Sequence, residues 1–156
     1  MIEVSRTSDT EYDLAFQTMK ENMISYHEQH GLPWNKDWID KSFRYNENYS
    51  IFRSTTWIGF LSLEWRNVDL FIHTLQLSKS AQGSVYGARV YDWIVEQMHL
   101  RGRSKITCKT FCGSPMIDLY KRMGFTEVAR ENYLATLEKR INKSRLADAS
   151  RHSSKR

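Results

Sequence analysis

The segment from Leu75 to Gln97, LQLSKSAQGSVYGARVYDWIVEQ, constrains the fold more than any other part of the chain. It opens with apolar residues typical of a strand, crosses a polar turn, and then shows the three- and four-residue spacing of a helix. The positions that recur at this spacing are Tyr86, Val90, Trp93, Ile94, Gln97 and Met98. Such a junction favours an α/β fold. It also creates an anion site, because the first N–H groups of a helix lack internal partners and the helix dipole adds positive potential.

The turn in this segment carries Gly83 and Gly87, which let the backbone approach a phosphate without an intervening side chain. Junctions of this kind also occur as plain structural turns, and the turn residues alone leave both interpretations open. Two nucleotide-binding motifs are absent from the sequence, G-x-x-x-x-G-K-[ST] and G-x-G-x-x-G. Neither a P-loop NTPase nor a dinucleotide-binding fold is therefore indicated.

Two segments resemble the coenzyme-binding motifs of the GNAT superfamily of N-acetyltransferases. Residues 82–88, QGSVYGA, are similar to the [RQ]-x-x-G-x-[GA] signature that holds the pyrophosphate of acetyl-coenzyme A. Residues 114–125, SPMIDLYKRMGF, are similar to the family's second coenzyme segment, which typically ends L-Y-x-x-x-G-F. The resemblance extends to about Ile141. It implies transfer of an acetyl group from acetyl-coenzyme A, as co-substrate, to a primary amine of a small molecule or protein, and the alternative is a non-catalytic coenzyme-A-binding sensor or scaffold.

The resemblance also implies which residues contact the coenzyme. These are Leu75, Gln76, Leu77, Gln82, Gly83, Ser84, Val85, Tyr86, Gly87, Ala88, Gly113, Met116 and Tyr120. Val85 stands where the family usually has a glycine, so we expect either an altered grip on the phosphates or a negative φ at this β-branched residue. Gly113 replaces an asparagine found in many relatives. These two departures motivate the non-catalytic alternative.

Tyr120 matches the family tyrosine that lies near the coenzyme sulfur. A phenol stays protonated at neutral pH, so it can serve the departing thiolate as a proton or hydrogen-bond donor. Tyr120 also shares one helical face with Met116, Ile117 and Met123, and this spacing is equally consistent with packing alone.

Three side chains are candidates for the base that deprotonates the amine. His73 precedes Leu75 by two residues, which places both on one strand face, and an imidazole accepts a proton near pH 7 with little tuning. Glu64 ends the neighbouring strand and could act as a base or clamp a cationic substrate. Asp69 is the third candidate, and water could also carry the proton. The resemblance implies that pantetheine lies beside Leu75–Leu77 like an extra strand, with a backbone N–H as the oxyanion donor.

Aromatic residues are frequent where the acceptor pocket should lie. The candidates for substrate binding are Tyr26, Trp34, Trp38, Trp57 and Trp65. Aromatic walls suit an amine on an apolar body, although the same residues also fit an aromatic core. His27 and His30 form H-E-Q-H, one residue short of H-E-x-x-H and without a third ligand, so we expect no metal.

The remaining pattern predicts the order β-α-α-β-β-β-α-β-α-β-β. Predicted strands cover 2–6, 49–53, 57–65, 70–77, 106–110, 125–128 and 132–137; predicted helices begin after Ser8 or Asp9, near Lys36, near Gly87 and after Ser114. Trp38, Ile39 and Phe43 are expected on the inner side of the second helix. The fold class is α/β, with a GNAT-like mixed, mostly antiparallel sheet of six to seven strands and about four helices on its faces.

Composition sets the limits of this domain. The 156 residues are enough for one domain, 1–141, followed by a basic tail, 142–156, that we expect to be disordered. The tail has five basic side chains and one acid, which accounts for +4 of the net charge of +5. The nearly neutral body argues against specific nucleic-acid binding.

The cellular setting is predicted from two further features. No apolar run approaches about 18 residues and the N-terminus lacks signal-peptide character, so we expect no membrane partner. Cys108 and Cys112 are too few for a disulfide framework and read as reduced thiols of a cytoplasmic protein. A homodimer is left open.

Overall fold

A seven-stranded sheet forms the centre of the computed structural model, which describes residues 1–141. The predicted tail, 142–156, lies outside the described residues. The strands are β1 (Glu3–Arg6), β2 (Glu47–Arg53), β3 (Thr56–Trp65), β4 (Leu70–Leu77), β5 (Lys105–Phe111), β6 (Thr126–Glu131) and β7 (Leu134–Arg140), in the spatial order β1-β2-β3-β4-β5-β7-β6. Every neighbouring pair is antiparallel except β4 and β5, which run parallel. The predicted mixed, mostly antiparallel sheet is confirmed.

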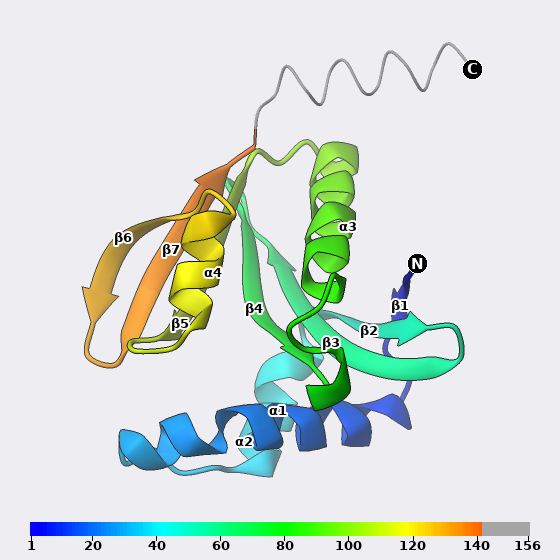
Figure 1. Ribbon diagram of the computed structural model, residues 1–156, viewed down its shortest axis with the longest axis vertical. Helices are drawn as coiled ribbons and strands as arrows, with labels where there is room; N and C mark the ends of the chain where they lie inside the picture. The colour runs from blue at the N-terminus through cyan, green and yellow to red at the C-terminus, as the bar shows by residue number, and fades with distance from the viewer. Residues whose placement is uncertain (142–156) are drawn as a thin grey trace.

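Helices cover both faces of this sheet (Figure 1). They are α1 (Glu11–Gln29), α2 (Lys36–Arg44), α3 (Tyr86–Arg101) and α4 (Met116–Arg122), with a short 3₁₀ turn, η1 (Lys79–Ala81), before α3. α1 and α2 lie on one face, and α3 and α4 lie on the other. The predicted order of elements is therefore confirmed within residues 1–141.

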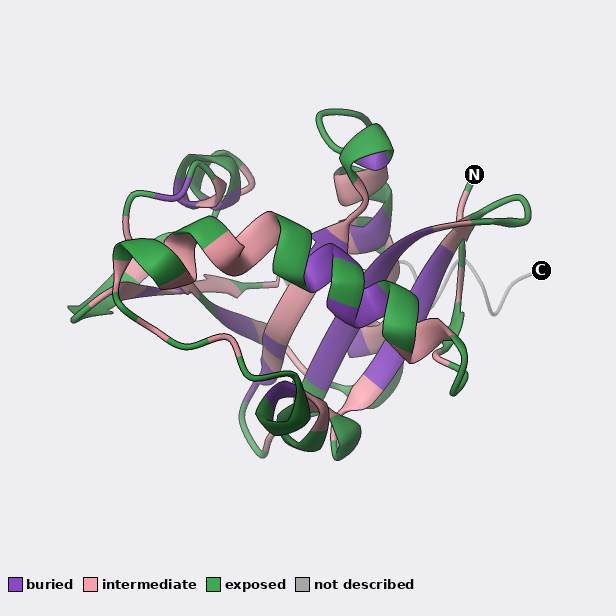
Figure 2. Ribbon diagram, turned by 90° about the horizontal axis from the view of Figure 1, so that it is seen from below, coloured by how far each residue is buried: buried purple, intermediate pink, exposed green. Residues whose placement is uncertain are grey.

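Two cores flank the sheet, and β3 divides its side chains between them. Phe60 packs with Phe16 and Met19 of α1 and with Ile39 of α2. Leu61 and its neighbours on the other face join the larger core, to which α3 contributes Val90, Ile94 and Met98. Figure 2 shows the buried residues gathered on the central strands. The alternation follows from the two-residue period of a strand, so β3 is apolar on both faces.

The start of α1 differs from the prediction. The helix begins at Glu11 with Thr10 at its N-cap, rather than after a Ser8 or Asp9 cap. The Glu11 carboxylate accepts a hydrogen bond from the Ser8 backbone N–H at 3.1 Å, while the Ser8 hydroxyl lies 3.3 Å from that of Thr10. The Ser8 side chain is thus used outside the helix.

Two further predictions were wrong: that Trp38 lies on the inner side of α2, and where the last two strands begin. Trp38 is 66% exposed, and Ile39 is the α2 residue that is buried against the sheet. Adjacent helical positions point about 100° apart, and here Ile39 faces the sheet while Trp38 points to solvent. The last strands begin later than predicted because their hairpin turns at Asn132, which adopts φ 53°. Asparagine tolerates this left-handed conformation better than most residues.

Candidate active site

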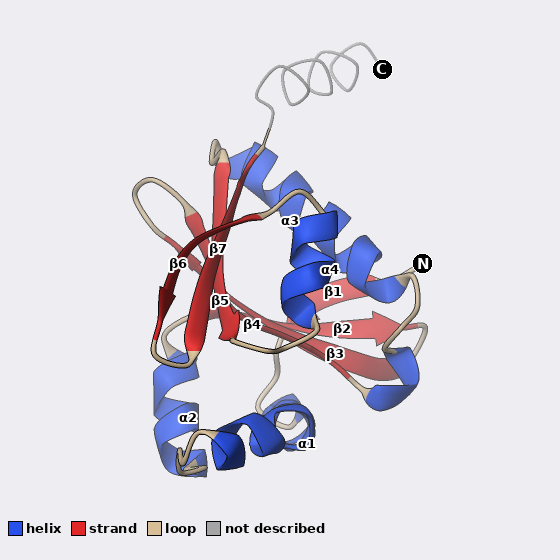
Figure 3. Ribbon diagram, turned by 60° about the vertical axis from the view of Figure 1, so that its left-hand side comes forward, coloured by secondary structure: helices blue, strands red, loops and turns tan. Residues whose placement is uncertain are grey.

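β4 separates from β5 part of the way along its length. The two strands pair only at Leu70↔Ile106, Phe71↔Thr107 and Ile72↔Cys108. β3 accompanies β4 to its end, where Gly59 pairs with Leu77. In Figure 3, β5 and β7 turn away from the direction of β4 and β3. The second half of β4 therefore borders a V-shaped gap in the sheet.

A β-bulge at His73 marks the point where the strands part. Ser62 pairs with Thr74 and Leu63 pairs with Ile72, so His73 is an extra residue in β4. Bulges bend a strand and increase its twist, which accounts for the divergence from β5 just beyond Ile72.

The bulge brings two predicted base candidates together. His73 Nε2 lies 2.7 Å from Glu64 Oε1 on β3, and the side chains are 30% and 46% exposed. The rings of Phe43 on α2 and Phe71 meet the imidazole edge-on, at 6.2 and 4.7 Å between centroids. The pair thus lies on the α1–α2 face of the sheet. Leu75 packs against the core on the opposite face, so the prediction that His73 and Leu75 share one strand face is wrong, because the extra residue of the bulge reverses the alternation. With Nε2–H donating to the carboxylate, Nδ1 carries the lone pair that can accept a proton.

Asp69 does not join this pair. Its carboxylate accepts hydrogen bonds from Arg66 Nε at 3.0 Å and from Thr107 Oγ1 at 2.6 Å. It lies immediately before β4, at the end of that strand opposite the gap. These contacts give Asp69 a structural role.

The main chain of β4 alternates between its neighbour and the gap. Ser78 N–H donates to Ile58 O at 2.8 Å, so it faces β3. Because direction alternates along a strand, Gln76 and Thr74 also direct their peptide groups to β3, and Leu75 and Leu77 direct theirs into the gap. The Leu75 and Leu77 N–H groups are therefore available to a ligand lying there.

The end of β4 is fixed by side chains from two other segments. The Leu77 carbonyl accepts hydrogen bonds from Asn22 Nδ2 of α1 and Gln82 Nε2 of the following loop, each at 3.0 Å. Asn22 Nδ2 also donates to the Gln76 side-chain oxygen at 3.0 Å, and Gln82 Nε2 donates to Asn22 Oδ1 at 3.1 Å. The predicted coenzyme residues Gln76 and Gln82 thus position the strand that borders the gap.

The loop before α3 has the form that the signature predicts. Gly83 adopts φ 69°, and the Ser84 hydroxyl donates to the Ala81 carbonyl at 2.7 Å. Val85 is the N-cap of α3 with φ −72°, which confirms the expected negative φ. The first bond from the helix back to Val85 O comes from Arg89 N–H, so the preceding amides of α3, those of Tyr86, Gly87 and Ala88, are the unpartnered N–H groups of a helix start.

The second coenzyme segment begins with a sharp turn. Gly113 adopts φ 85°, a conformation open to glycine and tolerated by asparagine, which explains why both residue types suit this position. The Ser114 hydroxyl accepts a hydrogen bond from Met116 N–H at 3.2 Å, and Gly124, with φ 95°, follows the end of α4. Pro115 is the N-cap of α4, so the helix begins one residue later than a Ser114 cap would place it, and Gly124 follows its C-cap, Met123.

Tyr120 lies in the core on the α3–α4 face. Its ring meets Phe125 at 5.0 Å between centroids. Burial, and secondly the neighbouring Cys108, raises the pKa of its hydroxyl, so the phenol is protonated at neutral pH. Cys108 is the last β5 residue paired with β4, and burial raises the pKa of its thiol to about 12. Tyr120 and Cys108 belong to the same buried core on the α3–α4 face of the sheet.

The predicted aromatic acceptor residues do not form one group. Tyr26 stacks on Phe111 at the end of β5, with centroids 5.4 Å apart, and Trp34 meets His27 at 4.9 Å. Trp38 is exposed on α2, as described above. Trp57 donates from Nε1 to Ser50 Oγ at 3.1 Å and packs against the α1 core.

Trp65 lies on the face of the sheet opposite His73 and Glu64. It packs against the larger core, with the Arg101 guanidinium 4.4 Å from its ring centroid. Glu64 precedes it on β3, and adjacent strand residues point to opposite faces. Glu64 therefore contacts His73, and Trp65 packs into the core on the far side of the sheet.

Residues that sequence reasoning missed lie on the same face as His73. Phe111 meets His30 at 5.8 Å and Tyr133 at 5.9 Å, which joins the end of α1, the end of β5 and the β6–β7 turn. Strand alternation from buried Cys108 would place Phe111 on this face, but no local signal indicates its distant partners.

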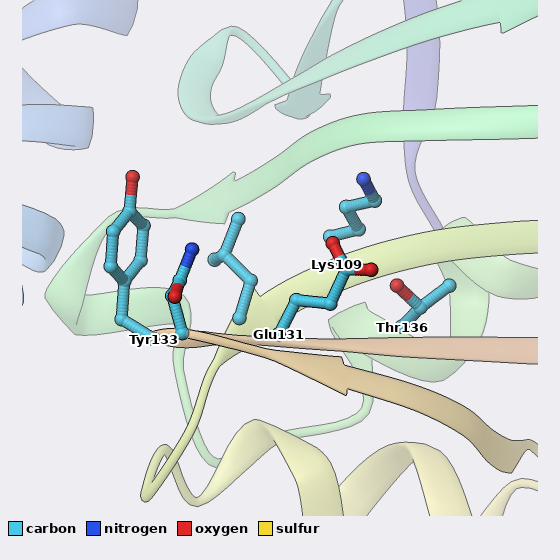
Figure 4. A pocket seen from close by; sticks show the side chains of 6 residues that line it. Lys109, Glu131, Tyr133 and Thr136 are labelled. Carbon is cyan, nitrogen blue, oxygen red and sulfur yellow. The ribbon is translucent and has the colours of Figure 1, made fainter.

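Two hollows open on the surface of the described chain. The smaller, about 100 Å³, is shown in Figure 4. It is lined by Lys109, Glu131, Asn132, Tyr133, Leu134 and Thr136. The larger, about 470 Å³, is lined by Asp13, Phe16, Gln17, Lys20, Trp34 and Lys36. Neither hollow includes His73 or Glu64. The smaller one is lined by Lys109 of β5 and otherwise by residues of the β6–β7 hairpin.

Residues 1–141 contain no group of three His, Cys, Asp or Glu side chains that could hold a metal ion. His27 Nδ1 lies 3.2 Å from the Pro33 carbonyl oxygen, and His30 stacks on Phe111. Over the same range, no helix is both long and apolar enough to cross a membrane.

An α/β fold whose mixed sheet splits between β4 and β5 leaves main-chain groups of β4 open to an extended ligand. The family model described as the acetyltransferase (GNAT) family matches residues 15–125, and the chain belongs to this family. It is an N-acetyltransferase that takes its acetyl group from acetyl-coenzyme A. No curated protein sequence matched the chain.

Solved structures show the same fold. The ribosomal-protein-S18-alanine N-acetyltransferase of Escherichia coli aligns with a TM-score of 0.69 and 17% identity, over 91% of this chain and 95% of that one. PaiA N-acetyltransferase of Thermoplasma acidophilum, in complex with coenzyme A, gives 0.69 and 14%, over 90% and 99%. Ard1 of Thermoplasma volcanium gives 0.73 and 9%, over 90% and 98%. At these identities the likeness concerns the fold.

Proposed function

We propose that the pantetheine arm of acetyl-coenzyme A lies between β4 and β5, with its diphosphate at the N-terminus of α3. The observation that carries this proposal is the end of β4–β5 pairing at Ile72↔Cys108. Beyond it, the Leu75 and Leu77 N–H groups point into the gap. A peptide-like arm can bond to these groups as an added strand would.

The open amides of Tyr86, Gly87 and Ala88 suit the diphosphate, because they combine unpartnered donors with the positive end of the α3 dipole. Adding a Cβ at Gly87 would meet no atom within 4 Å, so there is open space beside this turn. Val85 is accommodated by its negative φ and is 55% exposed. Its presence is therefore compatible with coenzyme binding.

His73 is proposed as the base. The amine gives a proton to Nδ1, directly or through water, while Nε2–H remains bonded to Glu64, which stabilises the imidazolium that forms. The amine nitrogen then attacks the thioester carbonyl, and a gap-facing N–H of Leu75 or Leu77 stabilises the oxyanion. Collapse of the intermediate breaks the C–S bond and releases the thiolate, and the nitrogen gives up its second proton to solvent as the amide forms.

Tyr120 is proposed as the hydrogen-bond donor to this thiolate. Because burial raises the pKa of Tyr120 above its ordinary value, the phenol is a weaker acid than a typical thiol. It can therefore stabilise the thiolate by hydrogen bonding, while the proton that converts the thiolate to the thiol comes from solvent. This role requires Tyr120 to contact the reacting sulfur.

Thiol release from acetyl-coenzyme A in the presence of an amine panel tests the function. We expect turnover by the wild type and a loss of about 10- to 100-fold in kcat for Tyr120→Phe, the range of a hydrogen bond to a charged group. Calorimetry should give the same coenzyme affinity for both proteins. Coenzyme binding without turnover of any amine would instead support the non-catalytic sensor or scaffold, and failure to bind coenzyme would reject both.

A cytoplasmic location stays a prediction, supported by the two free cysteines, Cys108 and Cys112. The sequence leaves a homodimer open. Sedimentation across a concentration series measures the mass directly, and a monomeric mass at every concentration would remove the dimer.

A further inference from the structure

Two polar side chains follow directly after the last paired residues of the fork. On β4, His73 follows Ile72, and on β5, Lys109 follows Cys108. Cys108 belongs to the α3–α4 core, so alternation directs Lys109 to the opposite face. Phe111, two residues further on, contacts Tyr26 of α1, which confirms that direction. The proposed base and a lysine thus flank the fork on the same face of the sheet.

Lys109 has no ion-pair partner among residues 1–141, and neither has Glu131, which lines the same hollow. Nearby charges on these strands are paired: Lys105 lies 3.8 Å from Glu138, and Arg130 lies 2.7 Å from Glu127. Figure 4 shows the Lys109 side chain rising from β5 above the sheet, beside Thr136 of β7. The hollow therefore offers unpaired charges of both signs, together with hydroxyl groups.

The hollow is also restricted in size. Its volume is about 100 Å³, well below the roughly 300–1,000 Å³ of pockets that enclose drug-sized ligands. Tyr133 at one end joins the ring cluster, 5.6 Å from His30 and 5.9 Å from Phe111 between centroids. These contacts link the β6–β7 turn to α1 and β5 on that side. A small polar head group fits this space better than a polypeptide chain.

We propose that the acceptor is a small zwitterion of the amino-acid type, whose carboxylate pairs with Lys109 while its amine reaches His73. The inference deepens the proposed acetyl transfer and rests on it. Glu131 and Glu64 attract the ammonium end on approach, and Lys109 binds the carboxylate and disfavours acceptors that carry only positive charge. The amine loses its proton to His73 once it is next to the thioester.

The test compares amino acids with their carboxamides, which keep the amine and skeleton but lack the negative charge. For a panel of α- and ω-amino acids, kcat/KM is measured for both forms with the wild type, Lys109→Gln, Lys109→Arg and Lys105→Gln. Lys105 is the matched control, because it lies on the same strand and is already paired with Glu138. Intrinsic differences in amine reactivity cancel when the acid-to-amide ratio is compared between variants.

We expect Lys109→Gln to lower this ratio about 10- to 100-fold, the range for a hydrogen bond to a charged group, with Lys109→Arg retaining most of it and Lys105→Gln unchanged. An equal ratio in wild type and Lys109→Gln would overturn the inference. So would turnover restricted to simple amines, although acetyl transfer itself would then stand. If no amine is acetylated by a protein that binds the coenzyme, both proposals fail.

Discussion

The two halves of β4 have similar apolar sequences and opposite uses. In the first half, Leu70 and Ile72 are 0% and 4% exposed, and the main chain pairs with β3 on one side and β5 on the other. In the second half, Thr74–Leu77 pairs with β3 alone. The first half uses all its peptide groups for the fold. The second leaves some unused, and a ligand can bond to those without any special side chain.

What separates the halves is a bulge and a set of anchors. His73 bends the strand, while Asn22 and Gln82 hold the Leu77 carbonyl at the far end. Gly59 allows β3 to stay close, since a Cβ there would lie 2.7 Å from the Gln76 carbonyl oxygen. The open half is therefore held rigid from both sides, which is what a preorganised site requires.

The junction between the halves gives the largest expected effect. His73→Gln removes the proposed base while keeping a polar side chain of similar length at the bulge. We expect kcat to fall by about 10²- to 10⁴-fold, the usual contribution of general base catalysis, with acetyl-coenzyme A affinity unchanged in calorimetry. A loss of affinity with normal kcat would mean that His73 shapes the gap rather than accepts the proton.

The open half can be disturbed through its neighbour. Gly59→Ala places a methyl group against Gln76 O and the Leu77 side chain, at 2.7 and 2.8 Å, so β3 and β4 must shift. We expect a loss of about 1–3 kcal/mol in the free energy of unfolding, together with weaker coenzyme binding. Gly87→Ala is the control. Its methyl group meets nothing within 4 Å, so stability is kept, and any loss of affinity reports the diphosphate alone.

The smallest expected effect concerns the paired half of β4, where the pH dependence of stability reports the burial of Cys108. Burial raises the pKa of Cys108 from 9.0 to about 12, so the folded state holds the proton while the unfolded thiol ionises. This contribution to stability is complete below pH 9 and is lost as pH rises from 9 towards 12, by at most about 1.4 kcal/mol per unit. Chemical denaturation between pH 9 and 10 should show a shallower loss for Cys108→Ala. An unchanged slope would show that the thiol is not shielded as described.

The proposed coenzyme site could be predicted from the sequence because its signals are local. Gly83, Val85 and Gly87 lie within one turn, and the negative φ at Val85 follows from its own side chain. The bulge at His73 and the anchor from Asn22 could not be predicted, because they depend on which residues oppose each other across the sheet. Asn22 lies 55 residues from Leu77 in sequence.

The side chains on the acceptor side of the sheet were harder to predict from the sequence. Trp65 was selected for its aromatic ring, but alternation along β3 puts it on the face opposite Glu64. Lys109 carries no motif, and the role proposed for it follows from its position just beyond the fork of β4 and β5. The residue types predicted which side chains could bind an amine. Which of them lie on the same face of the sheet depends on strand register, which the sequence does not reveal.

Amide hydrogen exchange in β4, with and without acetyl-coenzyme A, tests the central claim most directly. The N–H groups of Thr74 and Gln76 bond to β3, so they should be protected in both states. Those of Leu75 and Leu77 should exchange faster in the free chain and slow markedly when the coenzyme is bound. Unchanged exchange at Leu75 and Leu77 under saturating coenzyme would show that the open half of β4 does not bind it.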